Sequence, residues 1–147
     1  MSSTQASIHA TTVSMAQNAV LILGPSGAGK SAIALDLMAR GATLIADDQT
    51  IVRREEDMLF ARAPATISGM IEARGLGVFD VNPAALVRDE VQLSFAVDLG
   101  RPSTARLPEP AYRSVLGVTL PCFGGVKAPH LVPTILLCLA GTITLRP

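Results

Sequence analysis

A glycine-rich segment carries the residue types that bind a nucleoside triphosphate. Residues 24–31 read GPSGAGKS and match the pattern GxxxxGK[ST] in full. Glycines let backbone N–H groups approach phosphate oxygens closely, and a helix beginning at Lys30 would add the positive end of its dipole. Lys30 is expected to reach the β- and γ-phosphates, and the Ser31 hydroxyl to bind Mg²⁺. The predicted nucleotide-binding residues are Gly24, Pro25, Ser26, Gly27, Ala28, Gly29, Lys30 and Ser31.

An acidic pair, Asp47 and Asp48, follows the apolar run 43–46. If that run is a strand, both carboxylates lie at the carboxyl edge of the sheet, where open α/β sheets bind ligands. Adjacent strand residues point to opposite faces, so the two should have different roles. One could hold Mg²⁺, and the other could accept a proton from an attacking hydroxyl. From these residues alone, a solvated turn or helix N-cap across 47–50 fits equally well.

The elements that must position these residues follow from hydrophobic runs and glycines. The unbroken apolar run 19–23 is typical of a strand buried on both faces. Residues 30–40 are good helix formers, and Gly41 is placed where a helix ends. With 43–46 as the next strand, these elements form a βαβ unit. The fold class is therefore α/β, with a sheet that is at least partly parallel.

Weaker patterns predict the other elements within one domain spanning residues 1–147, of which 1–7 are expected to be flexible. The sequence shows no internal repeat and no segment of clearly different composition that would mark a second domain. The predicted elements are an edge strand in 8–15, a hairpin in 51–63 turning at 54–57, a short helix at 67–73, a loop at 75–77, a small strand at 78–79, a strand at 91–99, a loop at 100–110, a strand at 112–123 and a helix at 131–140 starting near Pro133.

Composition excludes several classes of protein. The 147 residues include 12 basic and 12 acidic side chains with no basic cluster, which argues against nucleic acid as a partner. A hydrophobic fraction of 49% excludes disorder for most of the chain. Cys122 and Cys138 lack metal-ligand spacing and are expected to be buried thiols of a reducing cytosol. We expect no signal peptide and no membrane partner, because the apolar stretch 131–145 is too short to span a bilayer.

Three segments resemble the catalytic domain of bacterial HPr kinase/phosphorylase. That family phosphorylates a serine of HPr, the phosphocarrier protein of the sugar phosphotransferase system. The segments are Ile8-His9-Ala10 before the loop, the block from Gly24 to Asp48, and IEARGLGVFDV at 71–81. The last is similar to the family's second signature, E-x-R-G-L-G-[IV], which P-loop proteins in general lack. The resemblance is strong over residues 9–81 and weak elsewhere.

The resemblance implies a P-loop kinase domain of the HPr kinase/PEP carboxykinase-like type, with a central mixed sheet and flanking helices. It implies a serine kinase that uses ATP and Mg²⁺ and takes an HPr-like phosphocarrier as its substrate. The matching catalytic residues are His9, Lys30, Asp48 and Arg106, with Asp48 accepting the serine proton; the metal residues are Ser31, Glu72 and, from the acidic pair, Asp47.

Plainer interpretations stay open beside these roles. Read without the resemblance, His9 fits a structural position in a strand. Glu72 and Arg74 fit a salt-bridged turn, and Arg106 fits a solvated loop. The residue types alone do not choose between these interpretations and the catalytic ones.

Two departures from the family bear on the reaction. About twenty residues precede the first core strand where full-length relatives carry an N-terminal domain. The segment P-x-R-P-G-R-N, tied to dephosphorylation, is replaced by FGGVKAP at 123–129, in which Lys127 is the one cation. This shorter pattern resembles the alphaproteobacterial-type members. We therefore expect kinase activity rather than phosphorylase activity, and a homo-oligomer, because relatives form hexamers.

Two other functions are compatible with the loop. One is a small-metabolite kinase whose lid would use Arg101, Arg106 and Arg113. The other is a non-catalytic nucleotide sensor that binds ATP and a partner without phosphotransfer. Each fits one P-loop domain of this size.

Overall fold

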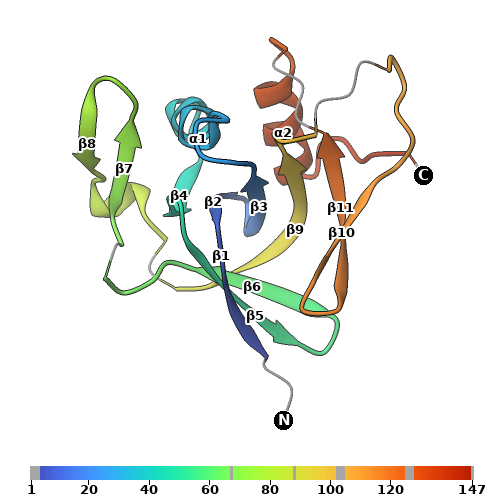
Figure 1. Cartoon of the computed structure of the whole chain (residues 1–147), viewed down its shortest axis with the longest axis horizontal. Coiled ribbons are helices and arrows are strands. Elements are labelled where there is room, and N and C mark those ends of the chain that lie inside the picture. Colours follow the sequence, from blue (N-terminus) through green and yellow to red (C-terminus); the bar gives the residue numbers. More distant parts are fainter. Residues whose placement is uncertain (1–3, 67, 88, 102–104, 125–127, 147) are drawn as a thin grey trace.

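A mixed β-sheet with two helices on one face organises the chain (Figure 1). The computed structural model describes residues 4–66, 68–87, 89–101, 105–124 and 128–146. The strand order is β1-β5-β6-β9-β3-β2-β4, with β11 joined to β9 and β10 to β11. The elements are β1 Gln5–Ile8, β2 Ala10–Met15, β3 Asn18–Leu23, α1 Lys30–Ala39, β4 Thr43–Ala46, β5 Thr50–Glu55, β6 Met58–Arg62, β7 Met70–Ala73, β8 Gly77–Asp80, a 3₁₀ turn Pro83–Ala85, β9 Val91–Asp98, β10 Tyr112–Val115, β11 Val118–Gly124 and α2 Leu131–Leu139.

Strand β3 lies at the centre of this sheet and confirms the predicted doubly buried strand. Val20 and Ile22 pack on the helix side, and Leu21 and Leu23 pack on the other, all at most 4% exposed. β3 pairs in parallel with β9 and antiparallel with β2, which in turn pairs antiparallel with β4. β3, β4 and β9 therefore run in the same direction, and their carboxyl ends meet at one edge of the sheet.

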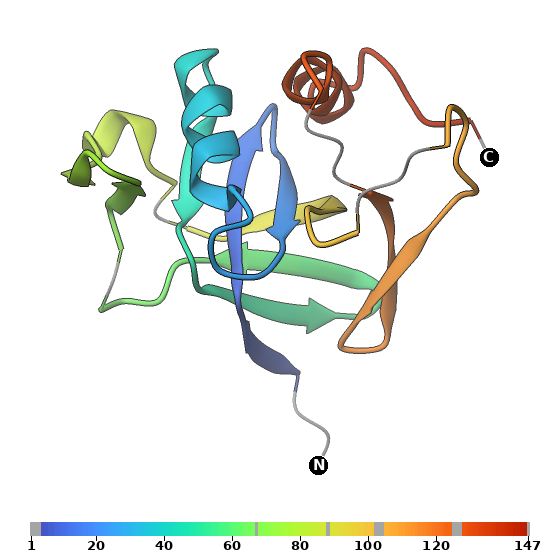
Figure 2. The ribbon, with the colours of Figure 1, turned by 45° about the horizontal axis from the view of Figure 1, so that its top comes forward.

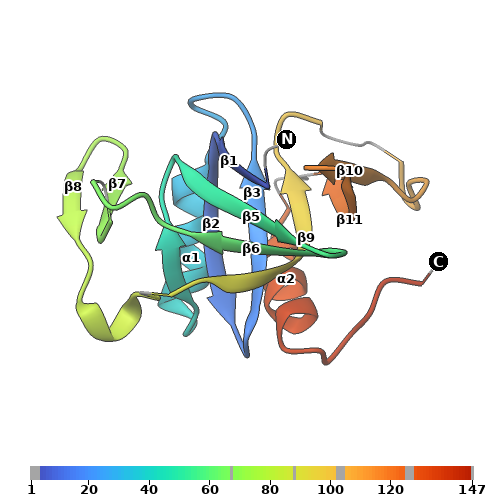
Figure 3. The same cartoon turned by 90° about the horizontal axis from the view of Figure 1, so that it is seen from below.

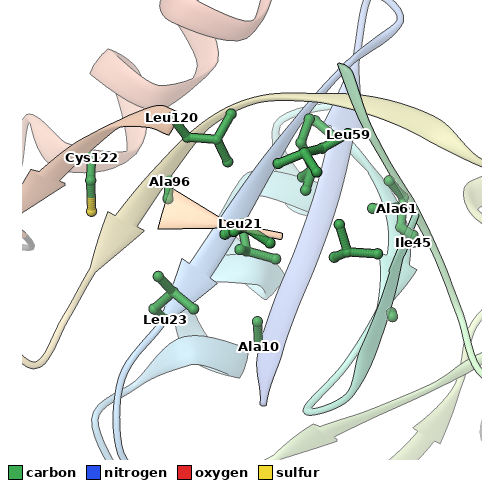
Figure 4. Close-up of a cluster of buried hydrophobic side chains, with 14 residues drawn as sticks. Ala10, Leu21, Leu23, Ile45, Leu59, Ala61, Ala96, Leu120 and Cys122 are labelled. Atoms are coloured by element: carbon green, nitrogen blue, oxygen red, sulfur yellow. The ribbon is translucent and has the colours of Figure 1, made fainter. Parts of the chain in front are cut away.

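Different elements cover the two faces of the sheet. Helices α1 and α2 lie over one face, as Figure 2 shows, and contribute Ala34, Leu37, Ile135 and Leu139 to its core. β5, β6 and the β10–β11 hairpin cover the other face; seen from below in Figure 3, β5 and β6 cross β2 and β3. Figure 4 shows this second core, whose labelled members are Ala10, Leu21, Leu23, Ile45, Leu59, Ala61, Ala96, Leu120 and Cys122. The central mixed sheet with flanking helices is confirmed.

The predicted βαβ unit forms around helix α1. The helix follows Gly29, whose φ is +103°, and ends where Gly41 adopts φ +108° and donates its N–H to the Met38 carbonyl. Gly41 therefore ends the helix as predicted, because its backbone conformation suits glycine. The β5–β6 hairpin, the small strand β8, strand β9 and helix α2 also lie where the sequence predicts them.

Three predictions about strands and helices are wrong. The segment 8–15 is not one edge strand: Ile8 ends β1, which is at the edge of the sheet, whereas 10–15 form β2, which lies between β3 and β4 inside it. The predicted helix at 67–73 is instead strand β7, paired antiparallel with β8, while position 67 lies outside the described residues. The predicted strand at 112–123 is a hairpin that turns at Leu116 and Gly117, both with positive φ.

The N-terminal segment, the two cysteines and the helices were also the subject of predictions. Strand β1 begins at Gln5, within the segment 1–7 for which flexibility was predicted, and residues 1–3 lie outside the described part. Cys122 and Cys138 are free thiols, the first buried and the second partly buried. Within the described ranges, no helix combines the length and the apolar character needed to cross a bilayer.

Candidate active site

The glycine-rich loop joins the carboxyl end of β3 to the start of α1, as its motif predicts. Gly24 has φ +149°, and a Cβ there would lie 3.1 Å from the Cβ of Ala28 and 3.2 Å from that of Leu99, so only glycine fits. Lys30 is 6% exposed, and its Nζ donates to the carbonyls of Gly24 at 2.8 Å and Pro25 at 3.1 Å. The ammonium group is thus held against the loop that would enclose the phosphates.

Asp47 connects three elements through its carboxylate. Its Oδ1 accepts hydrogen bonds from the hydroxyls of Thr11 at 2.9 Å and Ser31 at 2.7 Å. Its Oδ2 accepts the backbone N–H of Glu72 at 3.1 Å. Asp47, at the end of β4, therefore fixes β2, the first turn of α1 and the β7–β8 hairpin relative to one another. Because the Ser31 hydroxyl donates its proton in the hydrogen bond to Asp47, the lone pairs of the hydroxyl oxygen remain available to a cation.

Asp48 has different partners and a different direction from Asp47, although both residues lie beyond the end of β4 and not within the strand. Its carboxylate Oδ1 lies 2.8 Å from His9 Nε2, and the Asp48 and His9 side chains are 66% and 42% exposed. Its backbone has φ +71°, an unusual conformation for a residue other than glycine. Two hydrogen bonds hold it there: Asp48 N–H to Thr11 Oγ1, and Ala10 N–H to the Asp48 carbonyl. Strained backbones of this kind concentrate at functional sites.

Most of the predicted residues line one polar cavity of about 250 Å³. Its walls come from the loop, the start of α1, the second residue after β4, and the β7–β8 hairpin. The lining residues are Ser26, Gly27, Gly29, Lys30, Ser31, Asp48, Glu72 and Arg74. The cavity therefore combines backbone N–H donors, two cations, a hydroxyl and two carboxylates. Such a set can bind an anion and a divalent cation together and can accept a proton beside them.

The hairpin residues do not form the salt-bridged turn that was the plainer interpretation. Glu72 and Arg74 both line the cavity, and no ion pair joins them within the described ranges. Arg106 lies on an exposed stretch between β9 and β10 and does not line this cavity. Lys127 lies outside the described residues.

Two further polar residues were not predicted from the sequence. Thr11 is fully buried, and its hydroxyl donates to Asp47 and accepts from the N–H of Asp48, so it fixes both aspartates. Asp98, 8% exposed, ends β9 beside the loop, with Arg101 at 3.4 Å and Arg113 at 3.8 Å. An acidic residue at the end of a predicted strand was a signal for Asp98. Thr11 gave no signal, because nothing local places it between two neighbouring strands.

The strand, glycine-rich loop and helix define a phosphate-binding-loop domain. Residues 1–122 match the model of the protein family described as "HPr Serine kinase C-terminal domain". The chain therefore belongs to that family. The HPr kinase/phosphorylase of Halalkalibacterium halodurans is 43% identical over 96 residues, and that of Mycoplasmopsis pulmonis is 39% identical over 95. Both alignments cover 63% of this chain and 31% of the relative.

A solved structure has the same fold. The Hpr(Ser) kinase/phosphatase from Coxiella burnetii superposes with a TM-score of 0.74 at 27% identity, covering 93% of this chain and 95% of that one. This confirms the predicted fold class, a kinase domain of the P-loop type. The alignments with the curated relatives span about a third of those proteins' length.

Proposed function

We propose that the protein is an ATP-dependent serine kinase whose substrate is an HPr-type phosphocarrier protein of the phosphotransferase system. The observation that carries this proposal is the position of Asp48. Its carboxylate lines the same cavity as Lys30 and Ser31 and is bonded to His9. A proton acceptor thus stands beside the site of the terminal phosphate. A non-catalytic nucleotide sensor would not need that arrangement.

The proposed step is an in-line phosphoryl transfer. The serine oxygen of the phosphocarrier forms a bond to the γ-phosphorus of ATP, the bond from that phosphorus to the β–γ bridging oxygen breaks, and ADP leaves. The serine proton passes to Asp48. Because His9 occupies Oδ1 of Asp48, the other oxygen, Oδ2, is the one free to accept it. Lys30 and the loop N–H groups neutralise the phosphate charge, which is most of the catalysis in such reactions.

The oxygen ligands around the cavity suit Mg²⁺. Ser31 supplies a hydroxyl and Glu72 a carboxylate. Within the described ranges, no three or more His, Cys, Asp or Glu side chains are grouped so that they could hold a metal by themselves. Mg²⁺ in such sites is bound by one or two protein groups together with substrate phosphates, and it supplies charge neutralisation there. We assign Ser31 and Glu72 as its ligands. Asp47, whose oxygens are already engaged by three protein donors, acts on the ion through Ser31.

A second cavity is placed to accept the nucleoside. It measures about 450 Å³, meets the polar cavity at Gly29 and is lined by apolar groups that include Ile33, Leu99 and Val132. We assign the base and ribose to it, because a purine needs an apolar slot adjoining the phosphate loop.

Filling this second cavity should weaken nucleotide binding. Ala32 lies on the exposed side of α1 and lines the cavity. We expect Ala32→Phe to raise KM for ATP by about tenfold, roughly 1.4 kcal/mol, with kcat changed less than threefold. Initial-rate kinetics measure both constants. Ala39→Phe is the matched control, because Ala39 is exposed on the same helix outside the cavity. A KM within twofold of wild type in both variants would refute the nucleoside assignment.

A phosphotransfer assay tests the proposed function directly. The protein is incubated with Mg²⁺ and ATP labelled at the γ-phosphate, together with purified HPr or its nitrogen-branch paralogue. We expect label on a serine of one of them, and none on the same carrier with that serine replaced by alanine. Label on neither carrier, with the protein folded and ATP bound, would contradict the proposal.

The same assay distinguishes the rival functions. A small-metabolite kinase would consume ATP with a low-molecular-weight acceptor and no carrier. For such an enzyme the predicted lid used three arginines, but Arg101 and Arg113 are paired with Asp98. A sensor would bind ATP and transfer nothing. The family membership favours the carrier kinase.

Further parts of the proposal concern the setting of the enzyme. We propose a single catalytic domain in the described chain, acting in the cytoplasm, where free thiols such as Cys122 and Cys138 persist. We also propose that it phosphorylates without efficient dephosphorylation and forms a homo-oligomer. Incubating the phosphorylated carrier with inorganic phosphate tests the reverse reaction, and light scattering tests the assembly.

A further inference from the structure

A short turn after β9 packs directly against the first two residues of the phosphate-binding loop. Leu99 N–H donates to the Leu23 carbonyl at 2.8 Å, which carries the contact between β9 and β3 up to the start of the loop. A Cβ on Gly100 would lie 3.2 Å from Cδ of Pro25, and one on Gly24 would lie 3.2 Å from Cβ of Leu99. The turn and the loop are therefore packed together without space for a side chain at either glycine.

The carboxylate of Asp98 fixes the shape of this turn, which spans residues 98–101. Arg101 N–H donates to the Asp98 carbonyl at 3.3 Å, and the backbone N–H of Gly100 donates to Asp98 Oδ1 at 2.9 Å. The other carboxylate oxygen, Oδ2, faces the guanidinium groups of Arg101 and Arg113. A buried carboxylate needs partners of this kind, because an unpaired buried charge is costly. One oxygen of Asp98 thus holds the turn, and the other keeps the carboxylate in place.

The turn adjoins both parts of the proposed ATP site. Lys30 Nζ is bonded to the carbonyls of Gly24 and Pro25, the same two loop residues against which the turn packs. The Leu99 side chain lines the second cavity, to which we assign the nucleoside. A change in the shape of the turn would therefore move the start of the phosphate loop and one wall of the nucleoside cavity together.

We propose that Asp98 is a positioning residue for ATP, because its hydrogen bond to Gly100 holds the turn that supports the phosphate loop and Leu99. This inference rests on the proposed function, since it takes the two cavities as the site of ATP. Asp98 itself lines neither cavity. Its effect is assigned to the hydrogen bond and not to the negative charge, because Gly100 is the residue of the turn that contacts Pro25.

The test compares Asp98→Ala with Asp98→Asn by calorimetric titration with ATP and Mg²⁺, well below the Tm of each variant. Alanine removes the acceptor of the Gly100 N–H, whereas asparagine keeps a side-chain oxygen there without the charge. We expect Asp98→Ala to raise Kd for ATP about tenfold, the effect of losing one hydrogen bond to a charged group. Asp98→Asn should stay within about threefold of wild type. In initial-rate kinetics, KM for ATP should rise in Asp98→Ala with kcat changed less than about fivefold.

Glu90→Ala is the matched control for Asp98→Ala. Glu90 stands just before β9, at the end of the strand opposite Asp98, and is paired with Arg53 outside both cavities. Each alanine variant loses a carboxylate held by arginine, so each should lower Tm by about 2–6 °C. Glu90→Ala should nevertheless keep Kd for ATP within about twofold of wild type.

Gly100→Ala probes the same contact from the opposite side. Its new Cβ would press on Pro25 while the Asp98 carboxylate stays present. We expect Kd for ATP to rise by about three- to tenfold, because a tightly packed contact does not accept an added methyl group without a shift. The same titration measures it.

Three results would overturn the assignment. The first is an unchanged Kd for ATP in Asp98→Ala together with a lower Tm, which is the pattern of a residue that only stabilises the fold. The second is an equal rise of Kd in Asp98→Ala and Asp98→Asn, which would transfer the effect to the charge. The third is an equal rise in Glu90→Ala, which would make it a general effect of destabilisation. If the wild type binds ATP but phosphorylates neither carrier, the kinase proposal fails alone, and these Kd values still decide the role of Asp98.

Discussion

Asp48→Asn is expected to lower kcat for phosphorylation of the carrier by about 10²- to 10⁴-fold, the usual effect of removing a general base. Asparagine keeps the shape of the side chain, tolerates the positive φ of +71° at this position and can still accept a hydrogen bond from His9. The affinity for ATP should be unchanged or slightly higher, because a negative charge beside the phosphates is removed. Initial rates and calorimetric titration with ATP separate the two effects.

The control for Asp48→Asn is Asp57→Asn. Asp57 lies in the β5–β6 turn, has a side chain that is 99% exposed, and does not line the cavity. Its replacement should leave kcat within about twofold of wild type. If the two variants retain the same activity, Asp48 is not the proton acceptor, and the mechanism must use another group.

Asp47→Ala is expected to have the largest effect on stability. The substitution removes an acceptor shared by Thr11, Ser31 and the N–H of Glu72, of which Thr11 is fully buried. Hydrogen bonds to a charged group contribute about 1.5–3 kcal/mol each, and buried donors left unbonded add a penalty. With partial solvation, we expect a loss of about 3 kcal/mol and a fall in Tm of about 6–12 °C. Differential scanning calorimetry measures the fall.

Activity should also be lost in Asp47→Ala, because Ser31 and the hairpin lose their fixed positions. Ser31→Ala separates the two effects: it leaves two of the three donors on Asp47, so it should cost much less in Tm while still impairing Mg²⁺-dependent turnover. A Tm for Asp47→Ala within about 1 °C of wild type would show that the carboxylate does not join these elements.

The phosphate half of the site could be predicted from sequence because its determinants are local. Eight consecutive residues, an apolar run before them and helix formers after them specify the loop between β3 and α1. The acidic pair was also placed correctly at the end of a strand. We expected different roles for the two aspartates because neighbouring strand residues point to opposite faces. They do have separate partners, but both lie beyond β4, so the alternation of strand residues is not the cause; Asp48 adopts φ +71°.

The other half depends on contacts that no local pattern encodes. The loose alternation of apolar and polar residues over 8–15 predicted an edge strand, yet Thr11, Thr12 and Ser14 are all at most 5% exposed. Thr12 is bonded to Thr50, and Thr11 to Asp47, so partners from β5 and the end of β4 make the burial tolerable. Sequence reasoning cannot supply those partners before the strand order is known.

The hairpin was missed for a related reason. A four-residue strand such as β7 has too few residues to distinguish strand from helix periodicity, and its partner β8 is exposed along its whole length. Its position depends on Ile71 packing near α1 and on Glu72 N–H reaching Asp47. Arg74 could therefore be recognised as part of a signature string, while its location over Gly27 could not.

The separation of the β7–β8 hairpin from the main sheet, visible in Figure 1, bears on how easily the hairpin can open. A two-stranded sheet is barely stable in isolation, so the hairpin owes its order to the burial of Ile71 and the bond to Asp47. Local opening of such a unit requires less free energy than global unfolding. Opening would withdraw Glu72 and Arg74 together, leaving in place the loop, Lys30 at the start of α1, and Asp48 after β4. Amide hydrogen exchange at Glu72, whose N–H is bonded to Asp47, would then report how often the hairpin opens.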